Sequence, residues 1–351
     1  MGVLALGNVT ADDCTAVGYE AAVETTSAGG QVAVGRGALN KNETGGENTV
    51  MGYHARRFGT THRGTTIIGY EAAQGVNGQN SGADWNVAVG YVALKAVTTG
   101  NRNVGVGAST LTANTTGGYN TAVGYLAMSA NTTGDDNTAL GSNALDANTT
   151  GDNNTALGVN ALGGNTTAND NTAVGKDALG ANTTGTSNVA VGAYALDAAT
   201  TGSQLVAMGH NALGANTTAS DNTAIGHASL SANTTGDKNT ALGYQSLTAN
   251  TTGANLTAVG YEAGKSLTTA NNNTAFGYQA LRLTDTGTAN TALGLQCLNA
   301  NTTGNNNTAL GHQALDAATS ANYNIAIGCL LYTSDAADDT PCVDLGGRRI
   351  I

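Results

Sequence analysis

Residues 137–153 read NTALGSNALDANTTGDN, and close copies of this 17-residue unit fill most of the chain. The Gly that ends each short apolar run recurs every 17 residues from Gly18 to Gly328, with one longer step of 21 residues from Gly69 to Gly90. These anchor glycines number 19. A fixed period of this length indicates a repeat architecture in which each unit stacks on the next. The regular anchors include Gly124, Gly141, Gly158 and Gly175.

Each unit carries one short strand pattern. The residue before the anchor Gly is apolar in all 19 units, and the residue two places earlier is Thr or another β-branched residue. This alternation favours a strand, and the stretch left for a helix, under about eight residues, is too short to nucleate one well. The N-T-T-G run supplies turn residues. We therefore predict an all-β fold, a parallel β-solenoid or β-roll of about 19 turns with a 17-residue repeat.

Three columns of the repeat predict the interior. The fourth residue after the anchor is usually Leu, as at Leu145 and Leu162. We expect a bend near the Gly to turn both this Leu column and the Val/Leu column before the Gly toward one interior. The Asn that opens each unit, such as Asn137 or Asn154, should stack on its copies about 4.8 Å away and hydrogen-bond along the stack.

Composition and charge exclude several classes of protein. The chain has 50 Gly, one Pro and 4% aromatic residues, so an ordinary layered core of large side chains is not expected. The net charge is −11 and no block of Lys or Arg occurs, which argues against nucleic-acid binding. No apolar run reaches the roughly 18 to 20 residues that span a bilayer, so we expect no membrane insertion in this segment.

Residues 14–328 resemble two families of surface fibres. The N-T-A-[VI]-G-x-x-A unit resembles the head repeats of YadA-like trimeric autotransporter adhesins, and the longer unit looks closer still to phage tail-fibre-like repeats. The segments Ala241–Leu247 (ALGYQSL) and Ala275–Leu281 (AFGYQAL) carry the latter nearly intact. The resemblance implies a left-handed roll, assembly as a homotrimer, and a place on a virion tail fibre or a bacterial cell surface.

The repeat has two flanking segments. Residues 1–13 form a partial first turn or lead-in, and residues 14–328 form the repeat solenoid. Residues 329–351 contain CLLYTSDAAD and VDLGGRRII, which look like the constant parts of a translated sequencing adapter. We expect this tail to be non-native and the natural protein to continue beyond Gly328; the alternative is a genuine capping tail.

The repeat is irregular over residues 53–85. This segment holds the extra four residues and several bulky side chains, among them Phe58, His62 and the single Trp, Trp85. Insertions in repeat proteins become surface loops on one face. The segment is therefore either an atypical turn, which the base rate favours, or a binding loop.

No catalytic, cofactor-binding or metal constellation is found, and we expect the protein not to be an enzyme and to need no cofactor. His210 and His227 would lie on adjacent turns and could hold a metal, but their column accepts Tyr, Ser, Val and Lys elsewhere, which favours an exposed variable position. We expect this column to form a surface-recognition face. Its members are Tyr125, His210, His227, Tyr244, Tyr261, Tyr278 and His312.

Two functions remain open. The first is a structural or adhesive fibre segment that presents this face to a host receptor or glycan, with a three-chain seam covering the thin Ala/Leu interior. The second is an ice-binding or other surface-recognition solenoid. Against ice binding, the paired Thr residues lie in a turn, whereas a flat array needs alternating Thr on one strand face.

Overall fold

The computed structural model describes residues 5–6, 12–77 and 82–331 of the chain. It divides the chain into two compact units, Met1–Thr184 and Gly185–Ile351. The fold is all-β: every strand pairing is parallel, and no helix occurs in the described ranges. That part of the chain accordingly has no helix suited to crossing a membrane. The prediction of a parallel β-solenoid with a 17-residue repeat is confirmed.

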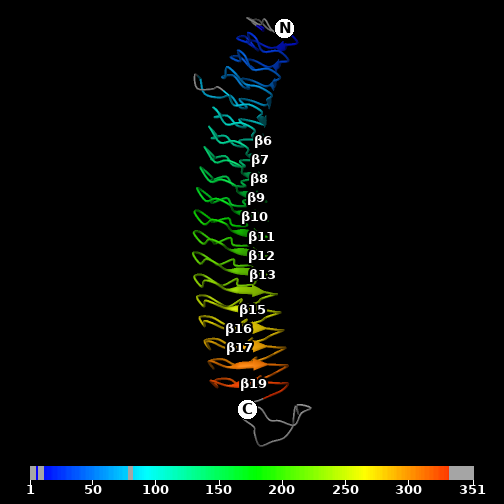
Figure 1. Cartoon of the computed structure of the whole chain (residues 1–351). Helices are drawn as coiled ribbons and strands as arrows, with labels where there is room; N and C mark the ends of the chain where they lie inside the picture. The colour runs from blue at the N-terminus through cyan, green and yellow to red at the C-terminus, as the bar shows by residue number, and fades with distance from the viewer. Residues whose placement is uncertain (1–4, 7–11, 78–81, 332–351) are drawn as a thin grey trace, which may run out of the picture. The chain divides into compact units, whose positions relative to one another are not determined.

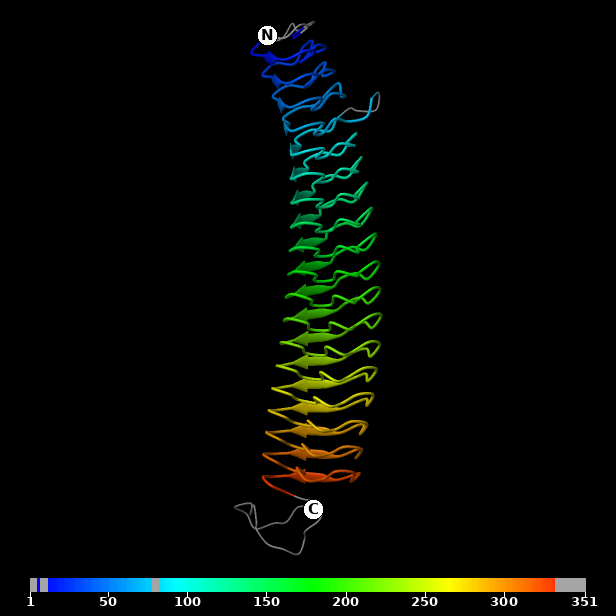
Figure 2. The same cartoon turned by 180° about the vertical axis from the view of Figure 1, so that it is seen from behind.

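Each turn contributes one three-residue strand, and the strands of a unit stack in one column while the rest of each turn returns on the other side (Figures 1 and 2). The first unit holds β1 (Thr15–Val17), β2 (Val32–Val34), β3 (Thr49–Met51), β4 (Thr66–Ile68), β5 (Val87–Val89), β6 (Val104–Val106), β7 (Thr121–Val123), β8 (Thr138–Leu140), β9 (Thr155–Leu157) and β10 (Thr172–Val174). The second holds β11 (Val189–Val191), β12 (Val206–Met208), β13 (Thr223–Ile225), β14 (Thr240–Leu242), β15 (Thr257–Val259), β16 (Thr274–Phe276), β17 (Thr291–Leu293), β18 (Thr308–Leu310) and β19 (Ile325–Ile327).

The strands pair in register, so equivalent residues of successive turns lie side by side. Thr138 pairs with Thr155, and Leu140 pairs with Leu157. The longer turn does not disturb this register, because Thr66 still pairs with Val87. Every column of the repeat is therefore a ladder along its unit.

The interior is narrow and lined by small residues and leucines. In β8 the middle residue, Ala139, is fully buried, and so are Ala144 and Leu145 farther along the turn; Leu162 is equally buried one turn on. The leucines reach across to the strand: a Cβ built on Gly105, at the middle of β6, would lie 2.9 Å from Cδ1 of Leu94. Leu from one wall therefore fills the space that Ala leaves on the other.

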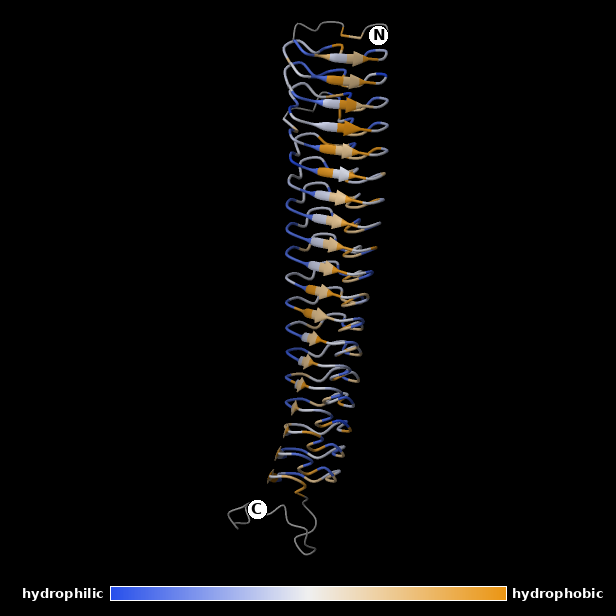
Figure 3. Cartoon of the chain, turned by 90° about the vertical axis from the view of Figure 1, so that its right-hand side faces the viewer, coloured by the Kyte–Doolittle hydropathy of each residue, from blue (hydrophilic) through white to orange (hydrophobic). Residues whose placement is uncertain are grey.

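The expectation that the Val/Leu column before the anchor Gly faces the interior is wrong. Leu140 is 48% exposed and Phe276 is 50% exposed, while the middle residue of each strand is buried. Side chains alternate along a strand, so burial of the middle Ala turns the first and third residues outward. Figure 3, which colours each residue by hydropathy, shows the apolar colour along the column of strands.

Left-handed backbone, rather than the Gly alone, turns the Leu column inward. Asn143 and Leu145 have φ values of 56° and 55°, and the corresponding positions recur in this region throughout both units. Gly141, with φ of 143°, precedes them. Two left-handed residues separated by one ordinary residue fold the chain back toward the strand, at a cost for each side chain that carries a Cβ.

Two ladders of buried Asn hold the turns together. Asn137 donates from Nδ2 to Oδ1 of Asn120 (3.2 Å) and to the Gly151 carbonyl (2.8 Å), and Asn154 repeats the first bond to Asn137 (3.1 Å). The second ladder is formed by the Asn of N-T-T-G, where Asn148 Nδ2 donates to Asn131 Oδ1 at 2.8 Å. All these asparagines are fully buried, so their side-chain amides form hydrogen bonds to the neighbouring turn in place of hydrogen bonds to water.

The boundaries of the repeat follow the strands. The first strand begins at Thr15 and the last ends at Ile327. Of the predicted non-native tail, only residues 329–331 belong to the described ranges, so the adapter interpretation stays a prediction, as does the left-handed winding.

Candidate functional site

The first residue after each anchor Gly forms an exposed column, here called the ring column because most of its members are aromatic. In the second unit, five of the predicted recognition residues stack on one another. The rings of His210 and His227 lie 5.4 Å apart between centroids with an interplanar angle of 9°, and His227 stacks on Tyr244 at 5.3 Å. Tyr244, Tyr261 and Tyr278 continue the stack at 5.3 and 5.2 Å.

The stack follows from the in-register parallel strands beneath it. Each ring leaves the backbone at the same point of its turn, so neighbouring rings are spaced close to the strand separation. Near-parallel rings at this spacing gain dispersion and exclude water from their faces. Their edges, with the Tyr hydroxyls and His nitrogens, remain at the surface, where they can donate and accept hydrogen bonds.

Two predicted members lie outside this stack. Tyr125 is separated from Tyr91 by Ala108 and is followed by Ser142 in the column. His312 is separated from Tyr278 by Leu295. Both residues are exposed, as expected, but neither makes a ring contact with its neighbours in the described structure.

The first unit has its own ring ladder, which the predicted site omitted. Tyr53 stacks on Tyr70 at 5.2 Å and Tyr70 on Tyr91 at 5.4 Å. Above them the guanidinium of Arg36 lies between two rings, 5.6 Å from the centroid of Tyr19 and 5.8 Å from that of Tyr53. The signal was present in the sequence, since these residues occupy the same column of the repeat.

A polar ladder lies at the next position of the second unit. Gln296 Nε2 donates to Gln279 Oε1, and Gln313 donates likewise to Gln296, both at 3.1 Å. The ladder begins at Glu262, whose carboxylate accepts hydrogen bonds from Gln279 (3.0 Å), Lys265 (2.6 Å) and Arg282 (2.9 Å). The Lys265 contact is the main cause that lowers the pKa of Glu262. The surface beside the rings is therefore polar with its one carboxylate paired.

The outward side of the strands is a second exposed surface, here called the strand face: the first and third residues of each strand. In the first unit its third-residue ladder is apolar throughout and consists of Val17, Val34, Met51, Ile68, Val89, Val106, Val123, Leu140, Leu157 and Val174. The first-residue ladder is Thr or Val. No charged residue occurs at either position in any of the nineteen strands.

The irregular segment 53–85 buries two basic side chains. Arg56 occupies the Leu column and is buried; its guanidinium donates to the carbonyls of Ala73 (3.4 Å) and Ala83 (3.2 Å). Burial lowers its pKa to about 9, against the opposing effect of Asp84. The ring of His62 is also buried, and burial, with a smaller effect of Arg56, lowers its pKa to about 2.

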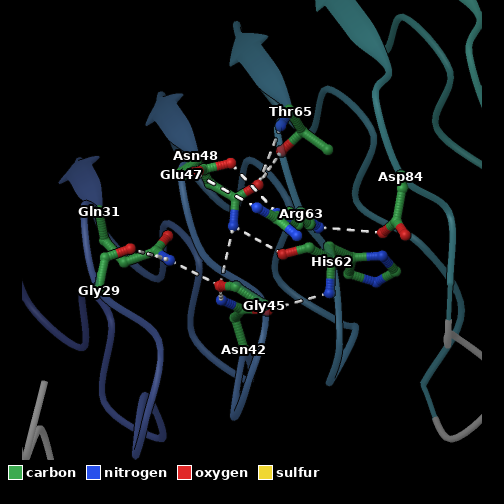
Figure 4. Close-up of polar contacts among 10 residues, drawn as sticks. All are labelled: Gly29, Gln31, Asn42, Gly45, Glu47, Asn48, His62, Arg63, Thr65 and Asp84. Atoms are coloured by element: carbon green, nitrogen blue, oxygen red, sulfur yellow. Dashed lines mark hydrogen bonds and ion pairs between the residues drawn. The ribbon is translucent and has the colours of Figure 1, made fainter.

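Figure 4 shows how this turn joins its neighbours. The backbone N–H of His62 donates to Asn42 Oδ1 (3.2 Å), and Asn48 Nδ2 donates to the His62 carbonyl (2.7 Å). Outside, Arg63 pairs with Glu47 (3.1 Å), and its N–H donates to Asp84 (3.0 Å). These contacts tie His62 and Arg63 into their unit. Residues 78–81 lie outside the described residues, so both interpretations of the segment 53–85, an atypical turn and a binding loop, stay predictions.

An open hollow of about 870 Å³ lies beside this turn. Its lining includes the carboxylates of Asp12, Asp13, Glu47 and Asp84, with Arg63 among them. Across residues 5–6, 12–77 and 82–331, no three His, Cys, Asp or Glu side chains gather as a metal site would require. Besides this hollow, the two ring ladders and the strand face are the exposed features described above.

No family model and no curated protein matches the chain.

Proposed function

We propose that this chain is a structural, non-catalytic fibre segment that assembles with copies of itself through the strand face and displays the ring ladders for attachment. The observation that carries the proposal is the unbroken ladder of apolar third residues along the strands, each of which is exposed or half-buried. Leu140 and Phe276, each about half exposed, are among its most exposed members, whereas Val106 is half-buried.

A continuous apolar strip of this kind is unusual on a monomeric soluble protein. Scattered exposed hydrophobic side chains need no explanation, but contiguous patches mark interaction surfaces. The strand face carries no charge that would oppose contact with an identical face. A second copy offers the same period in the same register, so a contact made at one turn is repeated at every turn of the unit. Three chains around one seam would cover the strip on each of them, which favours a homotrimer.

The ring ladders would then remain outward as the attachment surface. Tyr and His edges with the neighbouring Gln ladder offer closely spaced donors and acceptors, which suit a host receptor or a glycan. This role places the protein on a virion tail fibre or a bacterial cell surface, in keeping with the resemblance of its repeat to such fibres.

The assembly is tested by measuring the mass of the full chain in solution. The expected species has three times the 34.7 kDa chain mass. Replacing Leu140 and Leu157 together by Asp should shift it toward monomer while the far-ultraviolet circular dichroism stays that of a β-protein. Leu283→Asp is the matched control, because Leu283 is exposed but lies outside the strand face. A wild-type chain that stays monomeric at micromolar concentration contradicts the proposal.

The attachment surface needs its own test. Tyr244, Tyr261 and Tyr278 can be changed together to Ser, and binding of the chain to cells and to immobilised glycans compared with that of the parent. The triple variant should keep the parent's mass in solution and lose binding. Equal binding by the two proteins would assign attachment to another surface.

Ice binding remains a second candidate because of one observation. Besides the paired Thr residues of the turns, a second set of threonines lies on the strand face, where Thr121, Thr138, Thr155 and Thr172 form an outward ladder. Its partner ladder is Val or Leu of varying size rather than Thr, which makes the surface less regular than a water-ordering array requires. A thermal-hysteresis measurement separates the candidates, since a fibre segment should show none.

A further inference from the structure

The ring column has one position where an alanine separates two tyrosines. In the order of the chain the column reads Tyr70, Tyr91, Ala108, Tyr125 and Ser142, so Ala108 interrupts the aromatic ladder with a tyrosine on each side. Tyr91 and Tyr125 are each 58% exposed, more than any other tyrosine of the column. Tyr91 has one face against Tyr70, at 5.4 Å, and no ring at position 108 covers the other.

The same unit shows what fits between two tyrosines that are two turns apart. Tyr19 and Tyr53 are also separated by one intervening turn, and there the column supplies Arg36. Its guanidinium lies 5.6 Å and 5.8 Å from the two ring centroids, so it contacts both faces at once. A planar cation over a tyrosine face within about 6 Å is attracted by the ring quadrupole. Two turns of strand spacing, roughly 10 Å, leave room for one flat group between the rings.

We propose that Tyr91 and Tyr125, with Ala108 between them, form a binding site for an arginine side chain presented by a partner protein. The partner's guanidinium would lie between Tyr91 and Tyr125 as the guanidinium of Arg36 lies between Tyr19 and Tyr53. A methyl at position 108 leaves that place open to an external group, whereas an arginine at position 36 fills it from within.

The surrounding charges permit a cation at this site. The next position of the three turns carries Val92, Ser109 and Leu126, none of them charged. The basic residues of these turns have partners: Lys95 is paired with Glu71 at 2.8 Å, and the guanidinium of Arg102 donates to the Tyr119 hydroxyl at 2.6 Å. The chain as a whole has a net charge of −11, which favours the approach of a basic partner. One guanidinium on two exposed rings binds weakly, so the arginine must belong to a partner that makes further contacts.

The test uses the full chain with its tyrosine rings isotopically labelled and follows their NMR signals during titration with acetyl-Gly-Arg-Gly-amide. We expect shifts confined to Tyr91 and Tyr125, and no such shifts with the citrulline peptide, which keeps the shape without the charge. Tyr91→Leu or Tyr125→Leu should weaken binding roughly three- to tenfold. Tyr261→Leu is the matched control, because Tyr261 lies inside a continuous stack, and it should leave binding unchanged.

A gain-of-contact variant gives an independent readout. Ala108→Arg should place a guanidinium between the two rings, raise the thermal midpoint and abolish binding of the arginine peptide. Equal shifts with the arginine and citrulline peptides, binding that survives in Tyr125→Leu, or undiminished peptide binding by Ala108→Arg would each overturn the proposal. None of these readouts depends on whether the chain assembles through the strand face.

Discussion

The imidazole of His62 occupies the space beside Gly59: a Cβ built on Gly59 would overlap the Nε2 of His62. Regular turns have the opposite arrangement: the position equivalent to Gly59 is Asn, as at Asn131, and the position equivalent to His62 is Gly, as at Gly134. There the Asn131 side chain donates to the Gly134 carbonyl at 3.0 Å. The two residues of this irregular turn have therefore exchanged roles, and the His ring replaces a buried Asn.

This exchange predicts strong coupling between the two positions. Gly59→Asn alone should destabilise the protein for two reasons: its side chain collides with the imidazole, and the φ of 141° at this position strains any residue with a side chain. His62→Gly alone should destabilise it by leaving the ring's space unfilled. The double variant removes the collision and should recover that part of the loss, while the strain of a side chain at a φ of 141° remains. We expect a coupling free energy of about 2 kcal/mol, measured by denaturant unfolding in a double-mutant cycle. Additive effects of the two substitutions would contradict the exchange.

The sequence was sufficient to predict the fold because the 17-residue period is marked by residue types that the structure requires at fixed positions. A Gly such as Gly141, at φ of 143°, has no substitute in any of the 19 units, so its spacing stays visible. The column of the fully buried Asn137 keeps Asn in most turns and is replaced in a few, as by Leu205. The size of a side chain did not predict whether it points inward or outward. Leu145 already fills the interior opposite Ala139, so the larger Leu140 points outward.

The candidate site was predictable in part. The period of the repeat identified the column that holds His227 and Tyr244. Stacking, however, needs aromatic residues on consecutive turns, and Leu295 separates His312 from the ladder. The left-handed conformation of Leu145 had no sequence signal, because Leu carries no preference for it. The N-T-T-G run has the composition of an exposed turn and predicts only turn chemistry, whereas its asparagines form the buried ladder of Asn131 and Asn148.

A pH dependence follows from the buried His62. Its pKa is lowered from 6.5 to about 2 in the folded protein, chiefly by burial, so the folded state keeps the ring neutral. Between these values the unfolded chain binds one more proton, and the free energy of unfolding should fall as the pH falls, by at most about 1.4 kcal/mol per unit from this group. Urea unfolding at a series of pH values measures the slope. The Gly59→Asn/His62→Gly variant lacks the group and should show a shallower slope; identical slopes would rule out this contribution.

Exposed residues in left-handed backbone offer a route to higher stability. Lys238 has φ of 59°, and it is exposed. A Cβ in this conformation costs about 1–2 kcal/mol, and glycine avoids that strain. Glycine also raises the conformational entropy of the unfolded chain, which offsets part of the gain in stability. Lys238→Gly should therefore stabilise the protein by about 0.5 kcal/mol in denaturant unfolding. Lys238→Ala keeps the Cβ and should show no gain, and a gain of the same size in both variants would assign the effect to lost charge instead.

The anchor glycines should be the least tolerant positions of the repeat. A Cβ on Gly158 would lie 2.5 Å from the carbonyl oxygen of Gly175 in the next turn, and its φ of 139° is one that residues with a side chain rarely adopt. Neither atom group can move without breaking the ladder of turns, so Gly158→Ala should cost about 3 kcal/mol or more. Because each turn contacts only its neighbours, we expect the loss to appear as a separate early transition in thermal unfolding. Gly180→Ala is the control: its Cβ would meet nothing closer than 3.3 Å, and Asp146 occupies the same position of the repeat in another turn. A Gly158→Ala protein that unfolds like Gly180→Ala would show that the close approach of successive anchors is not what fixes the stack.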